Sequence, residues 1–161
     1  MIRVLLADDN AFVRSSLTEL FNSAGDVEVV GACTDGDEVV AATERTSPDV
    51  VVLDLVMARV GGLAAARDLL AVRPDARIVF LTANASAAAR REARDVGAAG
   101  FLLKDVDPEG LVRSVRRLAA GHTLWDGHDR DSHDPDRHDP SMTYGSRANT
   151  KGHDATRAAK N

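Results

Sequence analysis

The chain has 161 residues, of which 44% are hydrophobic and 28% charged, a balance typical of one domain with a buried core. Its net charge of −5 argues against broad electrostatic attraction to nucleic acid or to an anionic membrane. The single cysteine, Cys33, excludes an intrachain disulfide and fits a reducing cytoplasm, and no apolar run approaches the roughly 20 residues of a membrane helix.

Short apolar runs alternate with segments of helical period over the first 121 residues. Residues 1–7, which Arg3 interrupts and Asp8 ends, are too short for a signal peptide and predict the first strand. In chain order, we expect a strand over 2–7, a helix over 13–24, a strand over 27–32, a helix after Asp35, a strand over 50–53, a helix over 63–72, a strand over 78–81, a helix over 86–97, a strand over 100–103 and a helix over 108–118. Asp35 and Asp107 are placed to cap the helices that follow them.

The expected strands are apolar throughout rather than alternating, which indicates burial on both faces of a sheet. Their alternation with helices predicts a doubly wound α/β fold, with a five-stranded parallel sheet between two helix layers. In such sheets the ligand site lies beyond the carboxyl ends of the strands. The strand over 27–32 leads into Cys33 without a reactive group, so we expect it at the sheet margin, with Cys33 packed in the core rather than acting as a regulatory thiol.

Each of the other strands ends in a polar group. The first runs into Asp8 and Asp9, the third into Asp54, the fourth into Thr82 and the fifth into Lys104. Because parallel strands place their carboxyl ends on one edge, three carboxylates, a hydroxyl and an ammonium are expected to converge there.

Three neighbouring carboxylates repel one another unless a cation lies among them, and an all-oxygen donor set favours Mg²⁺. Lys104 can pair with Asp54 and later with a phosphoryl oxygen, to which Thr82 can donate a hydrogen bond. This combination supplies the positioning and charge neutralisation that phosphoryl transfer requires. An ionised carboxylate nucleophile needs no general base.

Four motifs, in order and each at a strand end, closely resemble the receiver domains of two-component response regulators, the CheY-like family. They are Ala7-Asp8-Asp9, Asp54-Leu55-Val56-Met57, Thr82-Ala83 and Leu103-Lys104-Asp105. The resemblance covers residues 1–121, which we take as the receiver domain. It implies a flavodoxin-like (βα)5 fold with the strand order 2-1-3-4-5.

The resemblance also implies that Asp54 accepts a phosphoryl group from the phosphohistidine of a sensor histidine kinase. Mg²⁺ would be held by Asp9 and Asp54 directly, by Asp8 partly through water, and by the backbone carbonyl of Val56. Such domains are phosphorelay signalling proteins rather than enzymes, and they hydrolyse their own aspartyl phosphate slowly.

Thr82 and Phe101 match the switch pair of the family, in which the hydroxyl turns toward the phosphoryl group and the ring moves inward. The altered surface would then bind a downstream protein or a second copy of the chain. The stretch over 98–105 most resembles the branch that usually carries a LuxR/NarL-type helix-turn-helix. One departure is Ala58, where the family commonly has proline.

Residues 122–161 form a polar segment rich in histidine and aspartate, with His-Asp pairs at 128–129, 133–134 and 138–139. After Trp125 there is no Leu, Ile, Val or Phe, so we expect a disordered tail in place of an output domain and no direct DNA binding by this chain. Metal binding by the histidines is an alternative, but Pro135 and Pro140 oppose a preformed helix face.

Several residues have a plainer interpretation. The alternative role for Asp8 is to cap the helix that follows, a role that Asn10 can also fill. The alternative for Phe101 is an ordinary core residue. The arginines of the fourth helix are expected to form a solvated face; they are Arg90, Arg91 and Arg94.

Two alternatives to a phosphorylated signalling domain are a truncated remnant of a LuxR/NarL-type transcriptional regulator and a receiver scaffold that works without phosphorylation. The acidic cluster and Lys104 argue against the scaffold, which has no need of that charge. A flavin-binding relative fits the sequence poorly, because the acidic loop after the first strand would repel a cofactor phosphate.

Overall fold

The computed structural model describes residues 1–83 and 86–125, so the expectations for the tail after Trp125 lie outside the described residues. Five strands alternate with five α-helices in the predicted order. In chain order they are β1 (Ile2–Ala7), α1 (Ala11–Ser23), β2 (Val27–Cys33), the 3₁₀ turn η1 (Gly36–Glu38), α2 (Val39–Thr46), β3 (Val50–Leu53), α3 (Gly62–Val72), β4 (Ile78–Thr82), α4 (Ala87–Asp95), β5 (Gly100–Leu103) and α5 (Pro108–Ala119). None of the described helices is long and apolar enough to cross a lipid bilayer.

The strands form one parallel sheet in the order β2-β1-β3-β4-β5, which confirms the flavodoxin-like topology. β2 lies at one margin, as its lack of a polar end predicts, and β5 lies at the other. The central strands β1, β3 and β4 are in register, with Leu6 beside Val52 and Val52 beside Val79. The carboxyl ends of these strands therefore meet at one edge of the sheet.

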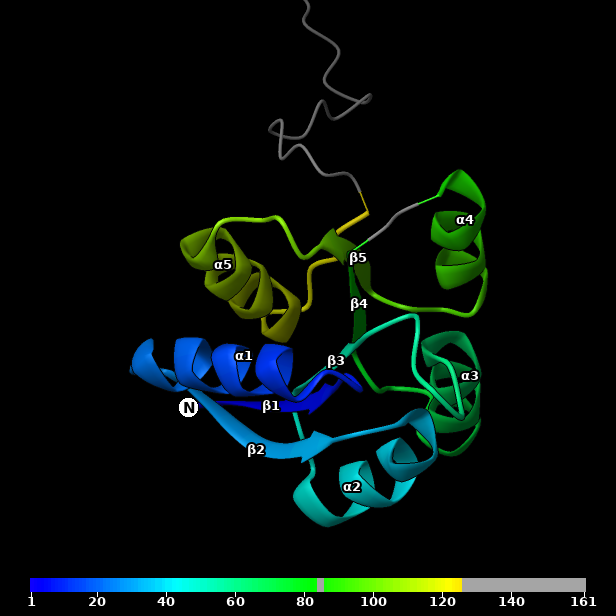
Figure 1. Cartoon of the computed structure of the whole chain (residues 1–161), viewed down its shortest axis with the longest axis horizontal. Coiled ribbons are helices and arrows are strands. Elements are labelled where there is room, and N and C mark those ends of the chain that lie inside the picture. Colours follow the sequence, from blue (N-terminus) through cyan, green and yellow to red (C-terminus); the bar gives the residue numbers. More distant parts are fainter. Residues whose placement is uncertain (84–85, 126–161) are drawn as a thin grey trace, which may run out of the picture. The chain divides into compact units, whose positions relative to one another are not determined.

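Each face of the sheet is covered by its own helices (Figure 1). Helices α1 and α5 cover one face, where Val4 and Leu6 point, and α2, α3 and α4 cover the other, where Leu5 and Ala7 point. All four of these β1 side chains are buried, which explains why the strand sequence is continuously apolar. Burial on both faces fixes the strands, so the side chains at their tips have defined positions.

The helix ends follow local hydrogen bonding. The Asn10 side chain caps α1 by accepting from the amides of Phe12 and Val13, so Asn10 rather than Asp8 is the cap of this helix. Asp35 and Asp107 are caps as predicted. One difference is that Asp35 caps the 3₁₀ turn η1, which precedes α2 and was not predicted.

After α5 the chain returns to the open side of β5. Leu124 donates its amide hydrogen to the carbonyl of Ala99 at 2.8 Å, and its own carbonyl accepts from Phe101 at 2.8 Å. Leu124 thus forms a parallel bridge with Gly100 and is buried. Ordered packing continues through this segment to Trp125, whose ring joins the core on the α4 side.

Two arginines of α4 contact this segment; the expectation of a solvated face is wrong for Arg90, which is half-buried, whereas Arg94 is exposed as expected. Arg90 lies over the Phe101 ring at 5.0 Å and donates a 2.7 Å hydrogen bond to the carbonyl of Trp125. Arg94 lies over the Trp125 ring at 4.9 Å. Such cation–π contacts recover part of the cost of fixing a long side chain. Arg91 is exposed.

Cys33 packs in the core at the end of β2, as predicted, with 2% of its surface exposed. Burial raises the pKa of its thiol to about 11, so the thiolate fraction near neutral pH is roughly 100-fold below that of an ordinary cysteine. We expect a thiol reagent at pH 8 to modify Cys33 at least about 100-fold more slowly in the folded chain than in the chain unfolded in urea. Similar rates in the two states, measured by mass spectrometry, would show that Cys33 is accessible.

Candidate functional site

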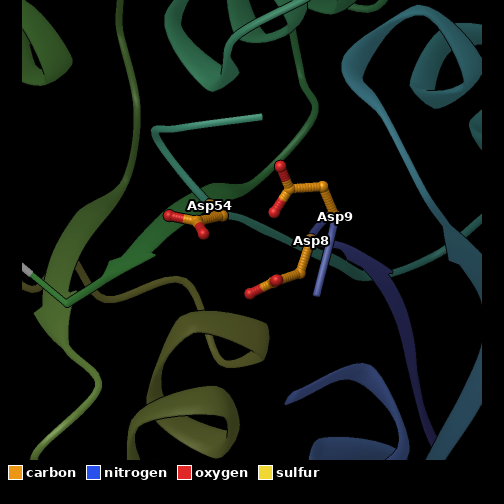
Figure 2. Close-up of side chains that lie close together, drawn as sticks. All are labelled: Asp8, Asp9 and Asp54. Carbon is orange, nitrogen blue, oxygen red and sulfur yellow. The ribbon is translucent and has the colours of Figure 1, made fainter. Parts of the chain in front are cut away.

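Three carboxylates meet where β1 and β3 end (Figure 2). These strands are neighbours, and the amide of Asp54 donates to the Ala7 carbonyl at 2.8 Å, which extends their pairing past the last strand residues. One carboxylate oxygen from each of Asp8, Asp9 and Asp54 lies within 4.8 Å of the others. The convergence predicted from the strand tips is therefore present.

The three carboxylates differ in their surroundings. Asp8 and Asp54 are buried, with 3% and 8% of their surfaces exposed, whereas Asp9 is exposed. Oδ1 of Asp8 accepts a 2.9 Å hydrogen bond from the amide of Asn10. Among the described residues Asp9 has no hydrogen-bond or ion-pair partner. A buried carboxylate pair without counter-charges would be strongly unfavourable, so a cation is needed nearby.

Lys104 supplies this charge from the tip of β5. Its Nζ lies 2.7 Å from Oδ2 of Asp54, as expected, and also 2.6 Å from Oδ2 of Asp8, which was not predicted. Burial lowers the pKa of the Lys104 ammonium, but the hydrogen bonds and charges of Asp54 and Asp8 raise it more, so its pKa lies above the ordinary value. Lys104 is thus charged at neutral pH and bridges the two buried carboxylates.

Thr82 ends β4, between the strands that carry Asp54 and Lys104, and is buried. Its backbone carbonyl accepts from the Lys104 amide at 2.9 Å. Thr82 and Asp54 line the same open cavity of about 580 Å³. The other lining residues are Leu55, Val56, Leu63, Ala83, Ser86 and Ala89. The cavity gives an incoming group access to the carboxylate of Asp54 from the side of Thr82.

Val56 lies in the connection between β3 and α3, two residues after Asp54. Its amide is 3.4 Å from Oδ1 of Asp54, a long hydrogen bond, and 74% of the residue is exposed. Gly62 closes this connection by donating to the carbonyl of Leu55 at 2.9 Å. A Cβ at Gly62 would collide with the Asp54 carbonyl, so the site requires glycine here. The Gly61-Gly62 pair in the sequence was a signal of this close approach that the sequence analysis did not use.

Phe101 lies in the core rather than at the acidic edge. It is 2% exposed, its ring centroid is 6.3 Å from that of Phe80, and Arg90 covers it. This packing fits the plainer interpretation of Phe101 as a core residue. Its part in a switch with Thr82 stays a prediction.

Comparison with known proteins agrees with this geometry. A family model described as the response regulator receiver domain matches residues 4–116. The chain belongs to this family. It is 37% identical over 124 residues to the uncharacterized transcriptional regulatory protein YxjL of Bacillus subtilis, covering 77% of this chain and 57% of YxjL. The chain thus spans little more than half the length of that curated relative.

Two further relatives consist mainly of a receiver domain. The chemotaxis protein CheY of Thermotoga maritima is 32% identical over 117 residues, which cover 73% of this chain and 97% of CheY. The solved receiver domain of the putative response regulator NarL from Mycobacterium tuberculosis superposes with a TM-score of 0.72 at 30% identity, covering 75% of this chain and 98% of that one. The resemblance to the NarL/LuxR branch is therefore confirmed.

Membership of the receiver family has direct consequences for the class of protein. Receiver domains are signalling domains of two-component response regulators rather than true enzymes. Receiver domains bind Mg²⁺ at an acidic pocket, and this chain has a cluster of three carboxylates, Asp8, Asp9 and Asp54, at the corresponding edge of the sheet. They act through histidine kinases and downstream proteins.

We expect the ion pairs of Lys104 to contribute measurably to stability. Lys104→Met leaves two buried carboxylates without their counter-charge and should lower the free energy of unfolding by about 1–3 kcal/mol in metal-free buffer, less than for a fully buried pair because the Lys104 side chain is 21% exposed. Added Mg²⁺ should recover more stability in this variant than it adds to the wild type, because it replaces the lost charge. Urea unfolding with EDTA or with Mg²⁺ measures both effects.

The control for this variant is Arg113→Met. Arg113 forms exposed ion pairs with Asp107 and Glu109, and such pairs contribute about 0–1 kcal/mol. Equal losses of stability in the two variants would show that the bridge from Lys104 is no stronger than a surface ion pair.

Proposed function

We propose that this chain receives a phosphoryl group on Asp54 from the phosphohistidine of a sensor histidine kinase. The observation that carries the proposal is the position of the Asp54 carboxylate. It is buried at a strand tip, 2.7 Å from Lys104 and beside two further carboxylates, and it lines an open cavity. In the transfer, an oxygen of Asp54 forms a bond to phosphorus as the N–P bond of the phosphohistidine breaks, and the imidazole nitrogen keeps the bonding pair.

The charges of the cluster fit a divalent cation. Three carboxylates and one ammonium leave a net charge of −2, which Mg²⁺ would balance. The available donors are all oxygen atoms, and Asp9 has no partner among the described residues, so its carboxylate is open to a ligand. Asp9 and Asp54 would hold Mg²⁺ directly, with Asp8 partly through water and with the backbone carbonyl of Val56. Bound there, Mg²⁺ would neutralise charge on the phosphoryl oxygens.

The remaining groups would bind the transferred phosphoryl group. Lys104 is already hydrogen-bonded to Oδ2 of Asp54. It can pair with a phosphoryl oxygen once the Asp54 carboxylate has become an acyl phosphate. The Thr82 hydroxyl can donate to another oxygen and, with Phe101, form the switch that alters the surface for a downstream protein or a second copy of the chain. This switch would be built within the proposed receiver unit of residues 1–121.

The phosphoacceptor assignment can be tested with acetyl phosphate and Mg²⁺. We expect wild-type protein to gain the mass of one phosphoryl group, and EDTA to prevent this. Asp54→Asn should gain none, because an amide is not nucleophilic, whereas Asp68→Asn, at an exposed position of α3, should react like the wild type. Intact-protein mass spectrometry reports the result, and labelling of Asp54→Asn to the wild-type extent would refute the assignment.

The kinase as donor needs a separate experiment. Profiling the chain against purified histidine kinases that carry labelled phosphohistidine should identify at least one rapid donor for the wild type and none for Asp54→Asn. Labelling by acetyl phosphate with no transfer from any kinase tested would support the chemistry of the site but not this donor.

A further inference from the structure

We infer that Asp35, on the connection between β2 and α2, is a positioning residue for the metal and phosphoryl site. It would act by fixing the connection between β3 and α3, which carries Val56. The inference rests on the proposed function, because it assigns Asp35 a part in presenting that site.

The carboxylate of Asp35 is buried, with 3% of the residue exposed, and accepts three backbone hydrogen bonds. Oδ1 accepts from the amide of Gly36 at 2.8 Å and from that of Val60 at 2.7 Å. Oδ2 accepts from the amide of Arg59 at 2.8 Å. Two of the three donors thus belong to the β3–α3 connection, more than 20 residues away in the sequence. Capping of η1 therefore accounts for one of the three hydrogen bonds that Asp35 accepts, and the other two hold the β3–α3 connection.

The backbones of the two connections are also in direct contact. The amide of Gly36 donates to the carbonyl of Val60 at 3.2 Å, while Val60 donates to Asp35. A Cβ at Gly36 would collide with that same carbonyl, so only glycine permits the approach. The Asp35-Gly36 dipeptide therefore holds the β3–α3 connection through both its side chain and its backbone.

Electrostatics favours an ionised Asp35. Burial raises the pKa of its carboxyl group, but the hydrogen bonds from the three amides and the charge of Arg59 lower it more, leaving the pKa below its ordinary value. Hydrogen bonds to an ionised acceptor are stronger than those between neutral groups. The Arg59 side chain adds an exposed ion pair to Asp37 at 2.9 Å, which contributes little.

The connection held by Asp35 has few other anchors. Val56, Ala58 and Arg59 are exposed, while Met57 is buried against the core. Ala58 replaces the proline that is common in the receiver family and that would restrict the backbone by itself. Because Asp35 accepts hydrogen bonds from two of its amides, the backbone between Asp54 and α3 is still held in one conformation. That conformation determines where the carbonyl of Val56, a proposed metal ligand, points.

The test uses Asp35→Asn and Asp35→Ser in the full chain. Asparagine keeps the size of the side chain but turns an NH₂ group toward one of the three amide donors. Serine keeps a capping hydroxyl for η1 but is too short to reach Arg59 and Val60. If asparagine at this position prevents folding, the serine variant still separates capping from anchoring.

Asp49→Ala is the matched control. Oδ2 of Asp49 also accepts a backbone amide from another strand, that of Arg3 at 2.8 Å, but Asp49 precedes β3 at the opposite end of the strand from Asp54. All variants are compared at a temperature where circular dichroism shows each to be fully folded.

Two readouts are measured. Amide hydrogen exchange in metal-free protein should accelerate by about 10-fold or more at Arg59 and Val60 in Asp35→Ser, and at the one of these two amides that faces the NH₂ group in Asp35→Asn. Their Mg²⁺ affinity, measured by calorimetry with MgCl₂, should weaken by about 10-fold, the loss typical when a group that orients metal ligands is removed. Asp49→Ala should match the wild type in both measurements.

The positioning role of Asp35 and the proposed function of the site are refuted by different results. Asp35 variants that bind Mg²⁺ as tightly as the wild type, or that keep the Arg59 and Val60 amides protected, would overturn the positioning role alone. A wild-type chain that binds no Mg²⁺ would overturn the proposed function and this inference with it.

Discussion

The structure depends on a balance of charge at the carboxyl edge of the sheet. Parallel pairing brings the tips of β1 and β3 together, so Asp8 and Asp54 are buried side by side whatever their mutual repulsion. Lys104 lies 2.6–2.7 Å from both of them and offsets part of this repulsion, but with Asp9 the cluster keeps two uncompensated negative charges. A residual negative charge favours binding of a divalent cation, so the same imbalance that costs stability supports the proposed chemistry.

Much of the fold could be predicted because the relevant signals are local. Continuous apolar strands indicated burial on both faces, and the polar residue after each strand indicated what the edge of the sheet would carry. The bond from Lys104 to Asp8 could not be predicted, because its geometry depends on how far β5 is offset from β1 across two intervening strands. The hydrogen bonds of Asp35 to Arg59 and Val60 join residues 24 and 25 positions apart, and no periodicity reports such contacts.

The half-burial of Arg90 on α4 escaped prediction for a similar reason. Three arginines on one short helix are typical of a solvated face, and Arg91 and Arg94 are exposed. Arg90 and Arg94 nevertheless lie over aromatic rings, one of them contributed by Trp125, which returns to the sheet after α5. A helix of such polar composition can therefore cover a core when the hydrocarbon part of its arginines lies along apolar surface.

The return of the chain beside β5 also affects how the molecule meets others. The outer strand of a sheet ordinarily offers unpaired amides and carbonyls to any extended peptide. On β5 the Phe101 amide is already bonded to the Leu124 carbonyl, with the Leu124 amide bonded just before the strand begins. A foreign strand that added along the start of β5 would first have to displace Leu124, so this residue covers the part of the sheet edge where β5 begins.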